Sequence, residues 1–189
     1  MARTAALDAR RAQLLTVGKQ IFSGRAYDAV STEEIAAQAG ISIGLLYHYF
    51  ANKKGFYVAT IRAAADDLLA AVRFPHGLAL AEATPLAVSS FLAFVEANDA
   101  LYTALMRGGV GADNEVHAIL EEVRVTIMAR VFDAGAITPT PALRLQLYGW
   151  LGLVEFSALR WLTHHEVSRD ELLGLMLAAV PPTLVEVQA

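Results

Sequence analysis

The chain has 189 residues, 56% of them hydrophobic, and a formal net charge of −4. It is long enough for one or two domains with a sizeable core, and its lack of cysteine excludes disulfide frameworks and zinc–thiolate sites. Residues 1–11 lack the continuous apolar segment of a secretory signal, and no uncharged apolar run is long enough to span a bilayer. We therefore expect a cytoplasmic protein with no membrane partner, whose apolar excess is buried at a subunit interface or around a cavity.

The first predicted helix covers residues 10–22. Leu14, Val17, Ile21 and Phe22 fall on one side of it, so it is amphipathic and has one face for a core.

Residues 31–50 predict two short helices joined by a tight turn. Ser31 followed by Glu34 is a capping box that begins the first of them. Gly40 stands where the chain must turn sharply, and Ser42 can cap the second helix. This is the helix-turn-helix arrangement, in which the second helix lies in the DNA major groove. The alternative is an ordinary helical hairpin inside an all-helical core.

The second helix of this pair has one side for the protein and one side for a partner. Leu46 and Phe50 lie four residues apart and point back toward the first helix, which leaves the residues between them facing outward. The outward side then offers DNA several hydroxyls, a ring nitrogen, apolar groups for thymine methyls and an ammonium. The candidate contacts are Ser42, Ile43, Gly44, Leu45, Tyr47, His48, Tyr49 and, at the start of the next helix, Lys53.

The charges divide in a way that agrees with this interpretation. Residues 1–62 hold eight Lys or Arg against four Asp or Glu, whereas residues 63–189 hold seven against fifteen. The basic end thus coincides with the helix-turn-helix, as attraction to phosphate requires. The alternative is a solvated surface with random charge asymmetry.

The rest of the chain predicts further helices and no strand. A long helix over 53–73 is broken by Pro75 and Gly77, and Thr84-Pro85 is expected to start the next. Further helices are expected over 99–107, 114–134, 141–164 (begun by Thr140-Pro141) and 168–180 (begun by a capping box), with the glycine-rich loop 108–113 between two of them. The prediction is an all-α chain of about nine helices, with a DNA-binding domain over 1–52 and a larger helical domain over 53–189.

The helix over 141–164 is apolar almost all round, so it must be covered on both sides. We expect it to form a homodimer interface together with the helix over 168–180, and Gly149, Gly152 and Ala158 would let another backbone approach closely. The alternative is a central core helix of a monomer.

The chain resembles the tetracycline-repressor (TetR) family of transcription regulators. The resemblance covers residues 10–62 and rests on the first helix ending in Phe22, the IAAQAGIS turn, the GLLYHYF recognition helix and the NKK that follows. It implies DNA contacts at the positions named above, with Ser31 or Thr32 adding phosphate contacts from the preceding helix. Many family members have a lysine where Ile43 stands and a small polar residue where Leu45 stands. We therefore expect less bidentate reading of guanine and more reliance on methyl contacts and DNA shape.

The resemblance also implies a four-helix dimer interface and an effector cavity in the larger domain. Glu155 is a carboxylate within an apolar helix and needs a partner, for which Arg160 or the other subunit is a candidate. The alternative for each aromatic residue or methionine is a plain core position. The candidate ligand-binding residues are Phe91, Phe94, Tyr102, Met106, Met128, Phe132, Tyr148, Glu155 and Trp161.

No pattern supports catalysis, a metal site or a cofactor. His164-His165-Glu166 lacks a histidine partner at i, i+4 and is interpreted as a polar helix end, and the loop over 108–113 lacks the lysine of a P-loop. The sequence therefore predicts a non-enzymatic homodimer that binds a palindromic operator and is released by a small, largely apolar effector. The same DNA contacts would serve activation, and the alternatives are a dimeric interaction protein without a ligand response and a helical enzyme.

Overall fold

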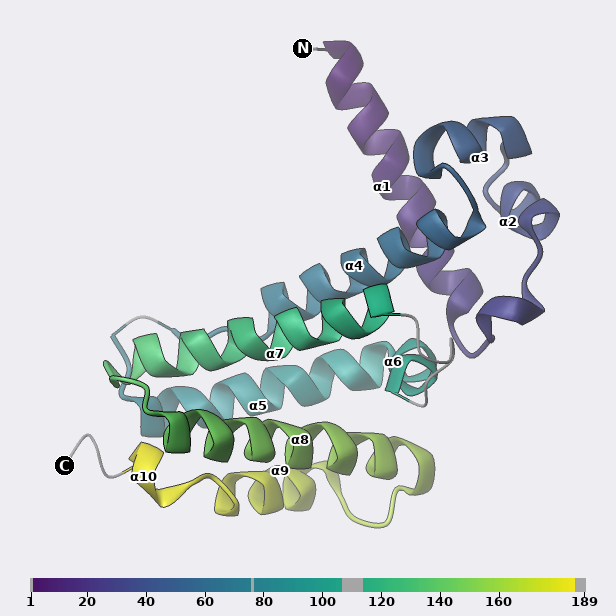
Figure 1. The fold of residues 1–189 in the computed structure, drawn as a ribbon. Helices are drawn as coiled ribbons and strands as arrows, with labels where there is room; N and C mark the ends of the chain where they lie inside the picture. Colours follow the sequence, from purple (N-terminus) through teal and green to yellow (C-terminus); the bar gives the residue numbers. More distant parts are fainter. Residues whose placement is uncertain (1, 76, 107–113, 186–189) are drawn as a thin grey trace. The chain divides into compact units, whose positions relative to one another are not determined.

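The computed structural model describes residues 2–75, 77–106 and 114–185 (Figure 1). Within these ranges the chain forms ten α-helices, one 3-10 helix and no strand, so the all-α prediction is confirmed. The helices are α1 (Ala2–Phe22), α2 (Thr32–Gln38), α3 (Ile43–Phe50), α4 (Lys53–Ala71), α5 (Leu80–Ala97), α6 (Asp99–Met106), α7 (Asn114–Ala134), α8 (Pro141–His164), α9 (Arg169–Ala178) and α10 (Pro182–Val185), with η1 (Tyr27–Ala29) as the 3-10 helix. The predicted glycine-rich loop over 108–113 lies outside the described residues.

The chain divides into two compact units. Unit 1 comprises Met1–Asp66 and Ala100–Ile119, and unit 2 comprises Asp67–Asp99 and Leu120–Ala189. Both α4 and α7 therefore contribute residues to each unit. The domain boundary after residue 52 stays a prediction.

Unit 1 is built around side chains from α1, α2, α3 and α4. Leu14 and Phe22 from α1, Ile35 from α2, Leu46 from α3 and Phe56 from α4 are each at most 1% exposed. The apolar side of the first helix was predicted from its spacing, and burial of these side chains stabilises the unit.

At Gly18, α1 packs tightly against Phe56 and Thr60 of α4. A Cβ placed on Gly18 would meet the Thr60 hydroxyl and would lie 2.8 Å from Cζ of Phe56. Thr60 is itself fully buried, and its hydroxyl donates to the carbonyl of Phe56 at 2.8 Å. The site therefore has no room for even one methyl group.

Unit 2 packs α5, α8 and α9 together through apolar faces and a few directed hydrogen bonds. The indole of Trp150 on α8 donates to the carbonyl of Met176 on α9 at 2.9 Å. The guanidinium of Arg169 donates to the carbonyl of Ser89 on α5 at 2.7 Å. These bonds join helices that are far apart in the sequence and set their axial positions.

The start of α5 differs from the sequence prediction. Thr84-Pro85 does not begin the helix; α5 begins at Leu80, with Ala79 as its N-cap, and Pro85 lies inside it. The Thr84 hydroxyl donates to the carbonyl of Leu80 at 2.7 Å. Burial of Leu80 and Ala83 extends the helix toward the N-terminus, which outweighs the local preference of proline for the first turn.

The first helix also starts earlier than predicted, at Ala2 instead of residue 10, whereas the starts predicted at Thr140 and Ser168 are confirmed. Thr140 accepts from the backbone N–H of Leu143 at 3.2 Å and is followed by Pro141 at the first helical position. Ser168 and Glu171 form a complete capping box at the start of α9.

One helix of the described part, α5, is long and apolar enough by length and composition to cross a membrane. It nevertheless carries Glu82 and Glu96, and its side chains Val88, Leu92 and Val95 are buried in the core of unit 2. Its buried face packs within that unit.

The tight contact at Gly18 gives a stability prediction. Gly18→Ala should lower the free energy of unfolding by about 1–3 kcal/mol through overpacking, although alanine has the better helix propensity. Thr16→Ala, on the exposed side of the same helix, is the control and should leave the midpoint of denaturation nearly unchanged. A Gly18→Ala protein that unfolds at or above the midpoint of the parent in a urea titration would contradict the contact.

Candidate functional site

The α2–α3 pair has the caps and the turn of a helix-turn-helix. Ser31 accepts from the N–H of Glu34 at 3.1 Å, and Ser42 accepts from the N–H of Leu45 at 3.2 Å. Gly40 has a φ of +63° between the two helices, in the left-handed region that favours glycine. Both helix starts and the turn were predicted from these residue types.

The glutamate of the first cap has a partner that the sequence did not indicate. The carboxylate of Glu34 pairs with the guanidinium of Arg25, which also donates to the carbonyl of Ala29 at 2.7 Å. The hydrogen bond from Arg25 holds the pKa of the Glu34 carboxyl below its ordinary value. The pair connects η1 to α2 and orients the start of the helix-turn-helix.

The inner face of α3 is held by an aromatic cluster. Leu46 is fully buried, and the Phe50 ring contacts the Phe56 ring edge-on, with centroids 5.0 Å apart. The ring centroids of Phe22 and Tyr57 lie 4.8 Å apart in a T-shaped contact. Because both buried residues of α3 lie on one side, the rotation of this helix about its axis is set.

The outer face of α3 carries the predicted DNA contacts. Leu45 and Tyr47 are each 39% exposed, and His48 and Gly44 are also exposed. A Cβ on Gly44 would meet only the Ser42 hydroxyl, at 3.9 Å, so the backbone there is open to close approach. The face contains no Lys, Arg, Asp or Glu, and it suits apolar and hydroxyl contacts to base edges.

The remaining predicted contacts lie around this face. The hydroxyls of Thr32 and Tyr47 are 3.3 Å apart, which connects the start of α2 to the outer face of α3. Ile43 and Tyr49 are half-buried, and the Tyr49 ring packs against the rings of His48 and Phe50. Partial burial and a DNA contact are compatible for Tyr49.

The start of α4 presents Lys53 in a constrained position. Asn52 caps this helix by accepting from the N–H of Gly55 at 2.7 Å, and a Cβ on Gly55 would collide with the carbonyl of Phe50. The ammonium of Lys53 lies 4.1 Å from the centroid of the Tyr27 ring. A cation held at a helix N-terminus, beside exposed N–H groups, is suited to a phosphate. The Asn52 cap and the Tyr27 contact were missed, although asparagine before a helix was a usable signal for the cap.

The predicted ligand-binding residues are distributed over both units. Tyr102 and Met106 belong to unit 1, and the other seven belong to unit 2. Phe91, Met128 and Phe132 are buried, and the Trp161 indole donates to the carbonyl of Val167 at 2.8 Å beyond the end of α8. Phe94 and Met106 are half-buried. Their role in ligand binding stays a prediction.

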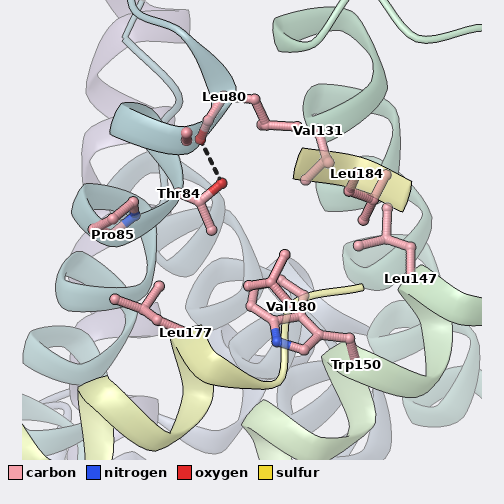
Figure 2. A pocket seen from close by; sticks show the side chains of 10 residues that line it. Leu80, Thr84, Pro85, Val131, Leu147, Trp150, Leu177, Val180 and Leu184 are labelled. Atoms are coloured by element: carbon pink, nitrogen blue, oxygen red, sulfur yellow. Dashed lines mark hydrogen bonds between the residues drawn. The ribbon is translucent and has the colours of Figure 1, made fainter. Parts of the chain in front are cut away.

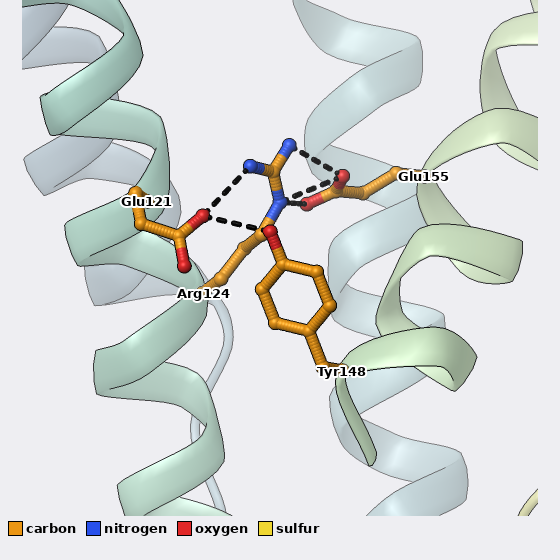
Figure 3. Close-up of polar contacts among 4 residues, drawn as sticks. All are labelled: Glu121, Arg124, Tyr148 and Glu155. Carbon is orange, nitrogen blue, oxygen red and sulfur yellow. Dashed lines mark hydrogen bonds and ion pairs between the residues drawn. The ribbon is translucent and has the colours of Figure 1, made fainter. Parts of the chain in front are cut away.

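Glu155 and Tyr148 belong to a polar cluster around Arg124 (Figure 3). Arg124 donates from Nε to Oε1 of Glu155 at 3.0 Å and from Nη2 to Oε2 at 2.8 Å, and it also contacts Glu121. The Tyr148 hydroxyl donates to Glu121 at 2.9 Å, which raises the pKa of that hydroxyl. Although burial lowers the pKa of the Arg124 guanidinium, its bonds to Glu155 and the charge of that carboxylate raise it above its ordinary value.

The partner of Glu155 therefore differs from the one suggested by sequence. Arg160 pairs instead with Glu166, next to the end of α8, and both of these side chains are more than half exposed. His164 is the last residue of α8, and His165 is its left-handed C-cap. No group of three or more metal-ligating side chains occurs within the described residues.

Two family models match the chain. Residues 14–60 match the model described as bacterial regulatory proteins, tetR family, and residues 80–180 match the model described as tetracyclin repressor-like, C-terminal domain. The first match contains the helix-turn-helix, and the second covers α5 to α9 with the segments between them.

Curated relatives include proteins of opposite regulatory sign. The HTH-type transcriptional activator FasR of Mycolicibacterium smegmatis is 30% identical over 128 residues, which are 67% of this chain and 58% of the relative. The HTH-type transcriptional repressor KstR2 of Rhodococcus jostii is 34% identical over 70 residues, which are 37% of this chain and 34% of the relative. The chain thus spans little more than half the length of the first relative.

Solved structures show the same fold. A tetR-family transcriptional regulator from Streptomyces coelicolor is 31% identical and superposes with a TM-score of 0.82, covering 95% of this chain and 86% of the other. A TetR-like transcriptional regulator from Rhodococcus sp. RHA1 is 23% identical with a TM-score of 0.67, covering 94% of this chain and 96% of the other. The similarity to the Rhodococcus protein shows the fold alone.

The Arg124 cluster gives a second stability prediction. Glu155→Leu should lower the free energy of unfolding by about 1–3 kcal/mol, because it leaves a largely buried guanidinium without its main acceptor. Arg124→Leu combined with Glu155→Leu should recover much of that loss. Glu166→Leu, at an exposed ion pair, is the matched control and should have little effect. Additive losses in the double variant, measured by chemical denaturation, would show that the pair is not coupled.

Proposed function

The chain belongs to the TetR family of bacterial transcription regulators, and from this premise we propose a homodimer that represses transcription at a palindromic operator and is released by a small, largely apolar effector. The observation that carries the proposal is the outward face of α3, which the caps and the buried residues of the same helix orient. The family consists of DNA-binding regulators rather than enzymes. We expect it to act in the cytoplasm, where its DNA is.

We assign DNA contact to the face that the caps and the aromatic cluster leave outside. Leu45 and Ile43 would contact thymine methyls, Tyr47 and His48 base edges, and Lys53 a phosphate. We further assign phosphate contacts to Ser31 and Thr32, and backbone or base contacts to Ser42, Gly44 and Tyr49. In this scheme residues 1–52 form the DNA-binding domain, and the residues from Lys53 onward connect it to the larger domain.

The outer face of α8 supports the proposed dimer. Leu145 and Phe156 are 74% and 64% exposed, and Gly149 and Gly152 lie between them on the same face. A Cβ on either glycine would have nothing within 4 Å, so the face is flat and open. Exposed large side chains of this kind in a row mark an interaction surface.

The second helix of the proposed interface, α9, has a face of the same kind. Leu175 is 61% exposed, Gly174 has open space around it, and Ala178 is also exposed. Leu172 and Met176 on the opposite side are buried in unit 2. Pairing α8 and α9 with their symmetry mates would bury both faces in a four-helix bundle.

The direction of regulation differs between the two relatives. One relative bears the name of an activator and the other that of a repressor, and the same DNA contacts serve either role. Release by an effector requires that the ligand bind one conformation of the dimer more tightly than the other. The competing function is a dimeric interaction protein without a ligand response, and ligand-induced thermal stabilisation would distinguish the two.

The first functional prediction distinguishes a residue that contacts the DNA backbone from a residue that reads the base sequence. Lys53→Ala should weaken binding to operator and random DNA alike and reduce the salt slope by about one, whereas Tyr47→Ala should also change the preferred sequence. Lys54→Ala is the matched control, because its ammonium is paired with Glu115 at 2.8 Å, and it should bind nearly as the parent does. A Tyr47→Ala protein that loses affinity equally for operator and random DNA, as Lys53→Ala should, would contradict this division of roles when measured by fluorescence anisotropy.

The second functional prediction tests the interface. Phe156→Glu should shift the protein from dimer to monomer in sedimentation experiments and weaken operator binding at least tenfold, because it places a charge in an apolar contact. The control is Leu86→Glu on α5, a side chain that is 50% exposed and lies outside the proposed interface. A Phe156→Glu protein that remains dimeric at the concentrations where the parent does would overturn the assignment of this face.

A further inference from the structure

We propose that a cavity in unit 2 is a binding site for a small uncharged molecule made of one apolar ring and a single hydrogen-bond donor, a phenol in its simplest form. The cavity has a volume of about 160 Å³ (Figure 2). A dry, apolar protein cavity of about 150 Å³ is known to bind benzene, so one six-membered ring fits this volume. The lining residues are Leu80, Ala81, Thr84, Pro85, Val131, Leu147, Trp150, Leu177, Val180 and Leu184.

The wall of the cavity excludes a charged ligand. None of its ten residues carries a charge, and its two polar side-chain groups are already engaged. The Thr84 hydroxyl donates to the carbonyl of Leu80, and the Trp150 indole donates to the carbonyl of Met176. A carboxylate buried here would lose its hydration without gaining a donor, and an ammonium would lose hydration that one backbone carbonyl cannot replace.

The cavity has an apolar floor and a more accessible rim. Leu80, Val131, Leu147, Trp150 and Leu184 are each at most 7% exposed and form the floor. Ala81 is exposed, and Thr84, Pro85, Leu177 and Val180 are half-buried, so these five residues form the rim. A ligand would therefore place its apolar ring against the floor and its polar group near the first turns of α5.

One lining residue, Ala81, has a backbone carbonyl that lacks its usual helical donor. Pro85 has no N–H, so the carbonyl of Ala81, four residues earlier in α5, cannot form the regular helical hydrogen bond. Helix carbonyls point toward the C-terminus, which directs this one toward Pro85, and both residues line the cavity. This acceptor suits a hydroxyl or N–H on the ligand.

None of the ligand candidates predicted from the sequence lines this cavity. Binding itself does not depend on the proposed function. Its consequence for DNA does, because Leu147 and Trp150 on α8 and Leu177 on α9 belong to the two helices of the proposed dimer interface.

The test uses the full chain and three probes of similar size, phenol, toluene and benzoate, titrated by calorimetry. Phenol should bind saturably, toluene more weakly, and benzoate at least tenfold more weakly than phenol. Val180→Phe should fill the rim and weaken phenol binding at least tenfold. The matched control is Val125→Phe on the exposed side of α7, which should bind as the parent does, since Val125 is 56% exposed and does not line the cavity.

A second variant tests the acceptor. Pro85→Ala restores the N–H that pairs with the Ala81 carbonyl, so phenol should lose its advantage over toluene while toluene binding is kept. Circular dichroism confirms that each variant is folded. Absence of saturable phenol binding to the folded parent, or unchanged binding in Val180→Phe, would overturn the site, and an unchanged phenol preference in Pro85→Ala would overturn the role of the carbonyl.

DNA binding measured with and without phenol separates the two proposals. Phenol binding at this cavity without any change in operator affinity supports the site and contradicts its use as the effector site. Failure of phenol to bind, in a protein that still binds operator as a dimer, overturns the cavity inference and leaves the DNA-binding proposal in place.

Discussion

The burial of Leu46 and Phe50 decides which side of α3 faces water, and the DNA-binding account depends on it. Leu46 is fully buried, and Phe50 is held in an aromatic cluster with Phe56. Rotating α3 by one residue would expose a phenylalanine and bury a tyrosine hydroxyl, at a cost in both apolar burial and hydrogen bonding. The same contacts that stabilise unit 1 thus leave Leu45, Tyr47 and His48 outside.

In unit 2, buried residues likewise fix which side of α8 faces inward, but the side left outside is apolar. On α8, burial of Leu147, Trp150 and Val154 fixes the inner face, yet the outer face is also apolar. In α3 the residues left outside are hydroxyls, a histidine and single apolar groups, which match the edges of bases. In α8 they are large apolar side chains separated by glycines, which match another helix. The chemistry of the outward face distinguishes the two proposed partners.

Local signals were enough to predict the helix-turn-helix and most helix boundaries. Caps at Ser31, Ser42 and Thr140 act within three residues, so the sequence alone contains the relevant contacts. Thr84-Pro85 carries the same kind of signal, but the helix start predicted from it was wrong. Burial of Leu80 in the core extends α5 toward the N-terminus, past Thr84. Local preference is a weak determinant where packing opposes it.

The polar cluster and the cavity could not be predicted, because both depend on contacts between distant helices. Arg124 and Glu155 are 31 residues apart, and nothing near Glu155 in the sequence distinguishes Arg124 from Arg160 as its partner. The cavity takes residues from α5, α7, α8, α9 and α10. Its walls are ordinary leucines and valines, whereas the sequence analysis favoured aromatic residues and methionines.

The central claim is that the outward face of α3 reads a sequence, and that two copies of it do so together. Its most direct test is the selection of bound genomic DNA fragments from the source organism at near-physiological salt, followed by sequencing. The account predicts enrichment of a palindrome whose half-sites are separated by one turn of DNA or a multiple of it. A folded dimer that enriches no sequence, or one that enriches a single site without symmetry, would contradict it.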